Sequence, residues 1–393
     1  MFVIRAVKIQ KRTEAELAPF HEDIARQIEE YHRTMPGYTK TPLVALPQLS
    51  QYLGLASLYV KDESMRFHLD AFKVLGGSYA IGRLLSDRFG IPLTGFEQIR
   101  EAVNAAGQVK PVFITATDGN HGRGVAYTAA CLGCRCIVLL PKGTVQIRLE
   151  HIKKLGAEAE ITNLTYDDAV RKAAQLAKEH GYILVQDTAW PSYEEIPLYI
   201  MQGYMTMARE ADCLNMPPTH VFLQAGVGSM AAAVTAYFAA KYKSQAPRVI
   251  LVEPEGADCI FRTAEQNDGN LHAVEHPESI MAGLCCGEPS PMAWKILQAY
   301  ASDCISMSDE VAALGMRVLG NPLPGDTPII SGESGASTTG CLVKLMRDPA
   351  YEELRNQLNL GRDARVLCFS TEGATDPINY RRIVWDGLYP SAR

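Results

Sequence analysis

The sequence predicts an α/β protein with two domains, each a mostly parallel sheet flanked by helices. Short, continuous apolar strands alternate with amphipathic helices, which is the pattern of a doubly wound parallel sheet. A chain of 393 residues is long enough for one large or two moderate domains of this kind. The unusual polar motifs follow predicted strands, at the sheet edge where such folds bind their ligands.

The alternation is clearest in the middle of the chain. Strands are predicted at "PVFITA", "CIVLLP", "AEAEIT" and "YILVQD", and the first intervening helix begins near Asn120. The three helices between these strands end at Gly133, Gly156 and Gly181, because glycine suits a left-handed helix cap. Later strands are predicted at "HVFLQ", "RVILVEPE" and "ARVLCFS". A change in composition predicts a small domain at 85–204 and a larger one formed by 1–84 and 205–393.

Composition and charge exclude several classes of partner. The net charge is −6 with no run of lysine and arginine, so we expect no nucleic acid. The longest apolar stretch, "MAAAVTAYFAA", is far shorter than the ~20 residues of a membrane span. The charged start "MFVIRAVKIQKRTE" lacks the apolar core of a signal peptide, so a soluble, cytoplasmic protein is expected.

Ten cysteines do not indicate a disulfide scaffold in a chain this long. The spacing of Cys131, Cys134 and Cys136 raises the question of a metal site. No second Cys/His cluster at zinc spacing follows, so we expect structural thiols and no metal.

Four motifs carry chemistry. In "AFKVLGGSYA", Lys73 stands where a helix begins; alone, it is most simply a solvated lysine, and it becomes reactive only when desolvated. In "QAGVGSMAAAV", a strand runs through a glycine turn into a helix. This arrangement suits a phosphate, although a tight turn between strand and helix explains the glycines equally well.

In "LCFSTEGATD", a strand ends at Ser370 and Thr371, whose hydroxyls could hydrogen-bond a heteroaromatic nitrogen or cap the next segment. In "ITATDGNHGRGVA", Asp118 stands at a helix start, where capping is the simplest role.

In this order the motifs resemble the fold-type II (tryptophan synthase β-like) pyridoxal-phosphate enzymes, and within them the diaminopropionate ammonia-lyase family. The resemblance is carried by "AFKVLGGSYA", "TATDGNHGRGVA", "VQDTAW", "QAGVGSM", "SGESGA" and "FSTEGATD", which span nearly the whole chain. It implies pyridoxal 5'-phosphate as cofactor, a small amino-acid substrate and a homodimer. It also implies that the larger domain binds the cofactor and that 85–204 is the substrate side.

The resemblance also implies individual roles. Lys73, beside Phe72, would carry the cofactor as a Schiff base, and Asn120 would contact its phenolic oxygen. The phosphate would be held by Gly226, Val227, Gly228, Ser229 and Met230. Ser370 or Thr371, with Thr371 preferred, would face the pyridine nitrogen. The substrate carboxylate would meet Thr117, Asp118, Gly119, Asn120 and His121, and Asp187 would lie near the substrate amino group.

The expected reaction is elimination of ammonia from 2,3-diaminopropionate, which gives pyruvate and a second ammonia. Lys73 would take the α-proton of the L-isomer and Asp118 that of the D-isomer. One departure concerns the substrate: this family often has Gly-Leu-Asn where this chain has His68, Leu69 and Asp70. His121 either titrates near the leaving amine or is satisfied by local hydrogen bonds.

Three alternatives remain open at this point. The first is another pyridoxal-phosphate-dependent β-elimination or β-replacement, on serine, threonine or a related amino acid. The second is a serine hydrolase built on Ser334 in "SGESGAS", which lacks the last glycine of a nucleophile elbow. The third is a silent amino-acid sensor on the same fold.

Overall fold

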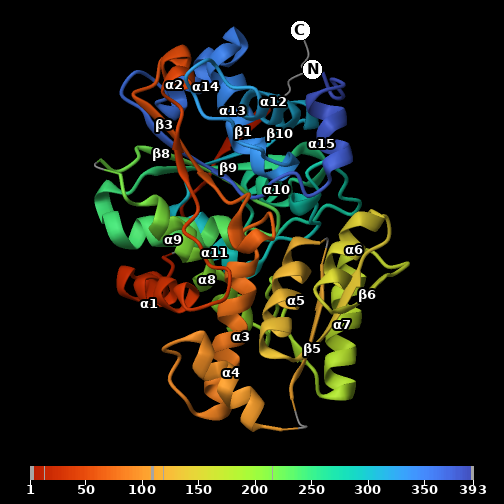
Figure 1. The fold of residues 1–393 in the computed structure, drawn as a ribbon. Coiled ribbons are helices and arrows are strands. Elements are labelled where there is room, and N and C mark those ends of the chain that lie inside the picture. The colour runs from red at the N-terminus through yellow and green to blue at the C-terminus, as the bar shows by residue number, and fades with distance from the viewer. Residues whose placement is uncertain (1–3, 13, 108–109, 118, 215, 391–393) are drawn as a thin grey trace. The chain divides into compact units, whose positions relative to one another are not determined.

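The computed structural model describes residues 4–12, 14–107, 110–117, 119–214 and 216–390. The chain divides into two compact units, each with its own sheet flanked by helices (Figure 1). Unit 1 comprises 1–18, 41–65 and 210–393, and unit 2 comprises 19–40 and 66–209. The α/β class predicted from the alternating pattern is thus confirmed.

Within the described residues, unit 1 holds a seven-stranded sheet in the order β1-β10-β9-β8-β11-β3-β2. Its inner strands run parallel, and β1 and β2 pair antiparallel at the two edges. The strands are β1 (Ile4–Lys8), β2 (Leu43–Ala45), β3 (Ser57–Asp62), β8 (His220–Gln224), β9 (Arg248–Pro254), β10 (Asp303–Met307) and β11 (Arg365–Ser370).

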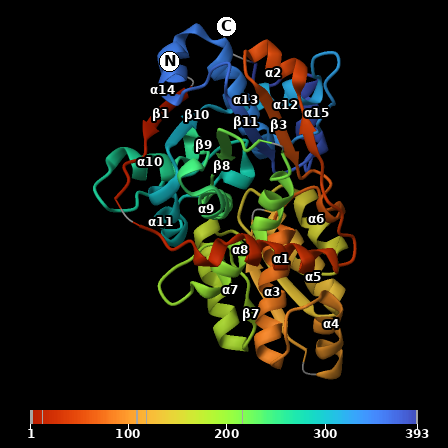
Figure 2. The same ribbon diagram turned by 90° about the vertical axis from the view of Figure 1, so that its left-hand side faces the viewer.

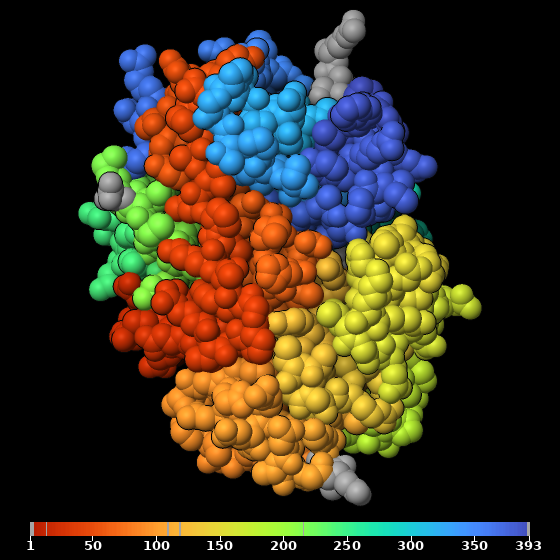
Figure 3. All heavy atoms as spheres, viewed as in Figure 1, coloured from red at the N-terminus to blue at the C-terminus, as the bar shows by residue number. Residues whose placement is uncertain are grey.

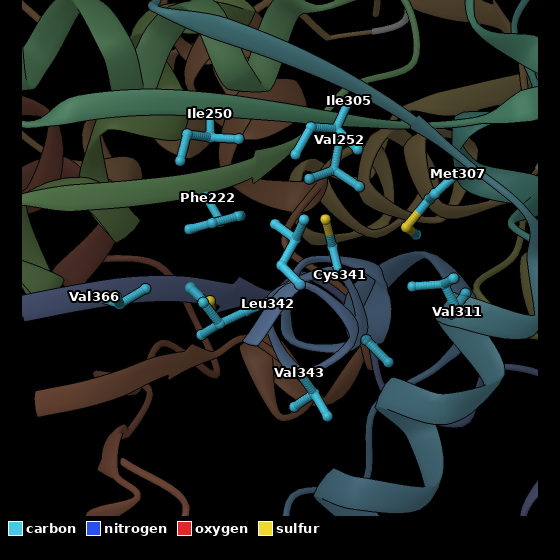
Figure 4. Close-up of a cluster of buried hydrophobic side chains, with 14 of the residues drawn as sticks. Phe222, Ile250, Val252, Ile305, Met307, Val311, Cys341, Leu342, Val343 and Val366 are labelled. Atoms are coloured by element: carbon cyan, nitrogen blue, oxygen red, sulfur yellow. The ribbon is translucent and has the colours of Figure 1, made fainter. Parts of the chain in front are cut away.

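The helices of unit 1 cover this sheet. They are α2 (Pro47–Leu53), α9 (Ser229–Tyr242), α10 (Cys259–Gln266), α11 (Pro291–Tyr300), α12 (Asp309–Gly320), α13 (Glu333–Arg347), α14 (Glu352–Leu358) and α15 (Pro377–Val384). Figure 4 shows how the core forms: Cys341 and Leu342 of α13 point at Phe222, Val252 and Ile305 of the sheet. This apolar layer fixes the strands whose ends carry the predicted motifs.

Unit 2 holds a parallel sheet of four described strands in the order β6-β5-β4-β7. The strands are β4 (Val112–Ala116), β5 (Arg135–Leu140), β6 (Glu158–Ile161) and β7 (Ile183–Leu184). The helices are α1 (Glu22–Arg33), α3 (Val74–Phe89), α4 (Phe96–Ala105), α5 (Asn120–Leu132), α6 (Gln146–Lys154), α7 (Tyr166–His180) and α8 (Glu195–Ala211), the last of which runs into unit 1 at its final turn. Gly133, Gly156 and Gly181 are left-handed after α5, α6 and α7, as the sequence predicts.

The structural division differs from the predicted 1–84/205–393 and 85–204. Residues 19–40 and 66–84 cluster with unit 2. The reason is helix packing: α1 and α4 lie against α3, and α3 lies beside α5 (Figures 1 and 2). The lysine helix therefore belongs to unit 2. Phe96, Ile99 and Val103 of α4 are buried. The orange segment of the chain that contains α4 forms part of that unit's surface (Figure 3).

Among the described residues, no helix is long and apolar enough to cross a membrane. The same residues contain no group of three or more histidine, cysteine or acidic side chains arranged to hold a metal ion. All ten cysteines are free, and Cys131 and Cys134 are half-buried whereas Cys136 is buried.

Candidate active site

The residues predicted to form the site divide between the two units. Unit 2 carries Phe72, Lys73, Asp187 and the described part of the turn 117–121. Asp118 lies outside the described residues. Unit 1 carries the glycine loop 226–230, Ser370 and Thr371. Each set is described by itself below.

Lys73 stands immediately before α3, and neighbouring helices hold that helix by close contacts at glycine. A Cβ atom on Gly76 would lie 2.5 Å from Cε1 of Tyr204 in α8. A Cβ on Gly124 of α5 would lie 2.7 Å from Cα of Val74. Any larger residue would therefore push α3 aside. Gly76 and Gly124 therefore allow helices of the same unit to approach closely.

Lys73 and Asp187 form an ion pair. Lys73 Nζ donates to Asp187 Oδ2 over 2.5 Å, and the Asp187 side chain is 4% exposed. Burial alone would raise the pKa of Asp187, but the charge of Lys73 and the nearby His121 outweigh that effect and hold the pKa well below its ordinary value. Asp187 is therefore ionised at neutral pH and stabilises a cation beside it.

A network on the other carboxylate oxygen fixes the orientation of Asp187. Oδ1 lies 3.4 Å from the hydroxyl of Tyr166 and 3.4 Å from Nε2 of Gln186. The Gln186 Oε1 in turn accepts from Ala116 N over 3.0 Å, which ties it to β4. Sequence reasoning missed Gln186 and Tyr166. The available signal was a glutamine beside the acidic residue at a strand end.

One ring nitrogen of His121 has a local hydrogen-bond partner. Its Nε2 lies 2.8 Å from the carbonyl oxygen of Val185. A carbonyl can only accept, so Nε2 carries the proton in the neutral ring. The other nitrogen, Nδ1, lies 4.0 Å from Asp187 Oδ2. Of the two roles considered for His121, the structure supports the local hydrogen bond.

The turn before α5 is organised by Thr117. Its Oγ1 accepts from the backbone N–H of Gly119 over 2.9 Å and of Gly122 over 3.1 Å. Thr117 therefore performs helix-start capping of the kind considered for Asp118. Gly119 has φ +146°, a conformation that side-chain-bearing residues rarely adopt, and Asn120 is the first residue of α5.

The loop before Lys73 is strained. Phe67, His68 and Asp70 have φ of 50°, 58° and 54°, in the left-handed region that favours glycine and asparagine. This explains why Gly-Leu-Asn suits these positions and makes the His68 and Asp70 of this chain costly there. The Asp70 carboxylate lies 3.5 Å from Nη2 of Arg123 on α5.

In unit 1, carbonyl groups of the glycine loop accept hydrogen bonds from backbone N–H groups of the same unit. Ser290 N donates to the Val227 carbonyl over 2.9 Å, and Ala232 N donates to the Gly228 carbonyl over 2.8 Å. Gly228 has φ +94°, and α9 begins at the next residue. The first N–H groups of a helix have no acceptor within it, so the start of α9 suits an anion.

Ser370 ends β11 and Thr371 follows it, and their hydroxyls have different partners. The Ser370 hydroxyl lies 2.8 Å from the hydroxyl of Ser331. The Thr371 hydroxyl accepts from Nε2 of Gln224 over 2.9 Å. The capping role considered for this motif falls instead to Asp376, whose Oδ1 accepts from the N–H groups of Ile378 and Asn379 at the start of α15.

Ser334 does not stand on a nucleophile elbow. It lies in the first turn of α13, and its hydroxyl accepts from Gly283 N over 3.2 Å. Residues 327–332, all of them described, form no strand before it. The strand-to-helix turn that exposes a catalytic serine is therefore missing.

Comparisons with known proteins place this arrangement in a family. The sequence profile of pyridoxal-phosphate dependent enzymes matches residues 34–369. The diaminopropionate ammonia-lyase of Salmonella typhimurium is 47% identical over 389 residues, covering 95% of each chain. The chain belongs to the diaminopropionate ammonia-lyase family.

Solved structures of this family agree. The crystal structure of diaminopropionate ammonia lyase from Escherichia coli in complex with an aminoacrylate-PLP azomethine reaction intermediate has a TM-score of 0.90 and 44% identity, and the match covers 98% of both chains. The complex of the same enzyme with D-serine has a TM-score of 0.92. The fold-type II architecture and a pyridoxal-phosphate-dependent lyase are thereby established for this chain.

The described residues of unit 1 fit the cofactor of a diaminopropionate ammonia-lyase. The cradle depends on glycine: a Cβ on Gly226 would lie 3.1 Å from Cys286 Sγ, and one on Gly228 would lie 2.8 Å from Ile260 Cδ1. The loop therefore keeps its N–H groups at the start of α9, where a phosphate is best stabilised.

Proposed function

We propose that this enzyme eliminates ammonia from 2,3-diaminopropionate, as the D- and L-isomers, and forms pyruvate and a second ammonia. The observation that carries the proposal is the buried, ionised Asp187 paired with Lys73. A carboxylate of this kind favours the cationic β-amino group that distinguishes diaminopropionate from serine and threonine. The identity with named diaminopropionate ammonia-lyases supports the same substrate.

Each predicted residue has a role in this proposal. Lys73 holds the cofactor covalently beside Phe72, Asn120 contacts its phenolic oxygen, and Thr371 contacts its ring nitrogen. The phosphate is held by Gly226, Val227, Gly228, Ser229 and Met230. The substrate carboxylate is bound by the turn 117–121.

The bound cofactor withdraws electrons from the substrate α-carbon and so makes the α-proton removable. Lys73 Nζ takes that proton from the L-isomer and the Asp118 carboxylate takes it from the D-isomer. Asp187 holds the β-ammonium group of the substrate in place of the lysine cation that it pairs with in this structure. Its anchored Oδ1 keeps Oδ2 directed at that cation.

A substrate panel tests this function. D- and L-diaminopropionate, D- and L-serine and L-threonine are each assayed for pyruvate or its homologue and for ammonia. We expect two ammonia per pyruvate from diaminopropionate and the highest kcat/KM for that substrate. A higher kcat/KM for serine or threonine would replace the proposal with another β-elimination.

Attachment of the cofactor is tested separately. Borohydride reduction followed by peptide mass spectrometry is expected to find the pyridoxyl group on Lys73, and Lys73→Ala is expected to lose both this label and the visible absorbance. A label on another lysine would move the attachment point.

We also propose that the enzyme is a cytoplasmic homodimer, on the strength of the family resemblance. Light scattering of the purified protein is expected to give twice the mass of one chain. A mass equal to one chain would contradict the dimer.

A further inference from the structure

Gln224, the last residue of β8, connects the glycine loop to the end of β11. Its side chain is buried, at 2% exposure for the whole residue. Nε2 lies 3.0 Å from the Phe369 carbonyl oxygen, 3.1 Å from the Ser334 carbonyl oxygen and 2.9 Å from Thr371 Oγ1. The amide is therefore surrounded on its nitrogen side by oxygen atoms from β11 and α13.

These neighbouring oxygen atoms determine which end of the Gln224 amide is the nitrogen and which is the oxygen. The carbonyls of Phe369 and Ser334 can only accept hydrogen bonds, so the atom that faces them must be the donor nitrogen. Thr371 Oγ1 consequently accepts from Gln224. The proton of the Thr371 hydroxyl is then directed away from Gln224 and is available to another acceptor.

The other end of the amide adds a second observation. Gln224 Oε1 is buried and has no hydrogen-bond partner within the described part of the chain. A buried acceptor without a partner costs free energy, and an apolar residue of similar size would avoid that cost. The position thus retains an amide for the sake of its donor end.

Ser370 differs from Thr371 in the hydrogen bonding of its hydroxyl group. The Ser370 hydroxyl donates to the Ser331 hydroxyl, and the Ser331 hydroxyl lies 3.5 Å from the Glu372 carbonyl oxygen. The proton of the Ser370 hydroxyl is therefore used inside the protein. Successive residues of an extended chain point to opposite sides. Thr371 alone of the two keeps a directed proton for a ligand.

We propose that Gln224 is a positioning residue that orients the Thr371 hydroxyl as a donor and so holds the ring nitrogen of the bound cofactor in its unprotonated form. This inference rests on the proposed function, in which Thr371 contacts that nitrogen. A protonated nitrogen would need a lone pair from Thr371 and would leave the threonine proton without an acceptor. Gln224 reaches the cofactor only through Thr371.

The test is the ¹⁵N resonance of the ring nitrogen in enzyme loaded with ¹⁵N-labelled pyridoxal phosphate. In the wild-type holoenzyme we expect the shift of a neutral, hydrogen-bonded nitrogen. Gln224→Met removes the donor and leaves the Phe369 carbonyl open to the Thr371 hydroxyl, which then turns inward. The resonance should move toward the protonated position and become dependent on pH.

Two variants of Thr371 and one control at Gln298 keep the test decisive if Gln224→Met folds poorly. Thr371→Val should lose the hydrogen-bonded shift, and Thr371→Ser should retain it. Gln298→Met, which changes a buried glutamine of α11, should leave the resonance where it is.

The possible outcomes separate this inference from the function. A protonated ring nitrogen in the wild-type enzyme, or an unchanged resonance in Gln224→Met, would overturn the inference while lyase activity stands. Failure of the wild-type chain to bind pyridoxal phosphate would overturn the inference and the function together.

Discussion

Lys73 Nζ and Asp187 Oδ2 lie 2.5 Å apart although 114 positions separate them in the chain. The pair joins the start of α3 to the segment that follows β7. It also gives unit 2 a built-in site for one cation, because the second oxygen of the carboxylate is occupied by Tyr166 and Gln186.

Asp187→Asn tests selection by charge. The amide keeps the size of the side chain and removes the charge, which in a charged hydrogen bond is worth about 1.5–3 kcal/mol, or roughly ten- to hundredfold. We expect kcat/KM for diaminopropionate to fall by this factor more than kcat/KM for serine, whose hydroxyl is neutral. Exposed Asp23→Asn on α1 is the control. An equal loss for both substrates would argue against a role in binding the β-ammonium.

Asp118→Asn tests the assignment of two bases to two isomers. An asparagine cannot accept the α-proton, so turnover of D-diaminopropionate should fall by at least a hundredfold (about the smallest contribution of a general base) while L-diaminopropionate turnover is largely kept. Steady-state kinetics with each isomer measure this, and the visible absorbance of the bound cofactor should be unchanged. Parallel losses for the two isomers would reject the assignment.

His68→Gly tests the strained loop. His68 is exposed and left-handed, so glycine should relieve strain without removing buried contacts. We expect a gain of about 1 kcal/mol in the free energy of unfolding, measured by guanidinium denaturation. His68→Ala removes the same imidazole and keeps the strain, so it should not stabilise. Equal stability of the two variants would show that backbone strain at this residue is negligible.

Glu253 predicts a pH dependence of stability. It is buried at the end of β9, where burial raises the pKa to about 8 against 4.5 for an ordinary glutamate, despite hydrogen bonds from Ile260 N and Phe261 N. The folded protein therefore holds this proton more tightly than the unfolded chain does. Its contribution is fully present below about pH 4.5 and is lost, by up to ~1.4 kcal/mol per pH unit, as pH rises to about 8.

Glu253→Gln should lack this slope, so the difference in unfolding free energy between wild type and variant should change with pH across pH 5–8, measured by denaturation at each pH. Exposed Glu255→Gln, two residues away, should leave it in place. A slope that survives in Glu253→Gln would mean that Glu253 is ionised in the folded state.

The parts of the fold that could be predicted from the sequence are those with local signals. The strands and helices from β4 to β7 follow apolar runs and glycine stops, and they stand where the sequence predicts them. Strand β10 was missed because "DCISM" reads as polar. In the structure Asp303 is buried against Arg248, and the Ser306 hydroxyl donates to Asp258 over 2.7 Å. Those partners are distant in the chain, so no local pattern reports them.

Some residues of the candidate site could likewise be predicted from local motifs, and others could not. Lys73 and the glycine loop were recognisable as motifs, and the resemblance supplied their roles. Gln224 and Gln186 were not recognisable, because a glutamine acts through the geometry of its amide and carries no motif. Their roles depend on backbone groups that are distant in the chain, the Phe369 carbonyl for Gln224 and the Ala116 N–H for Gln186.

The antiparallel edge strands of unit 1 have a consequence for behaviour in concentrated solution. Strand β1 shields the edge of β10, all five residues of which are buried, and presents exposed Arg5 and Lys8 outward. At the opposite edge, β2 is only three residues long. Short or charged edges of this kind discourage the edge-to-edge pairing of strands from different chains that leads to aggregation. A chain shortened to begin at residue 9 would leave the edge of β10 with unpaired backbone N–H and C=O groups and should precipitate where the longer chain stays dissolved.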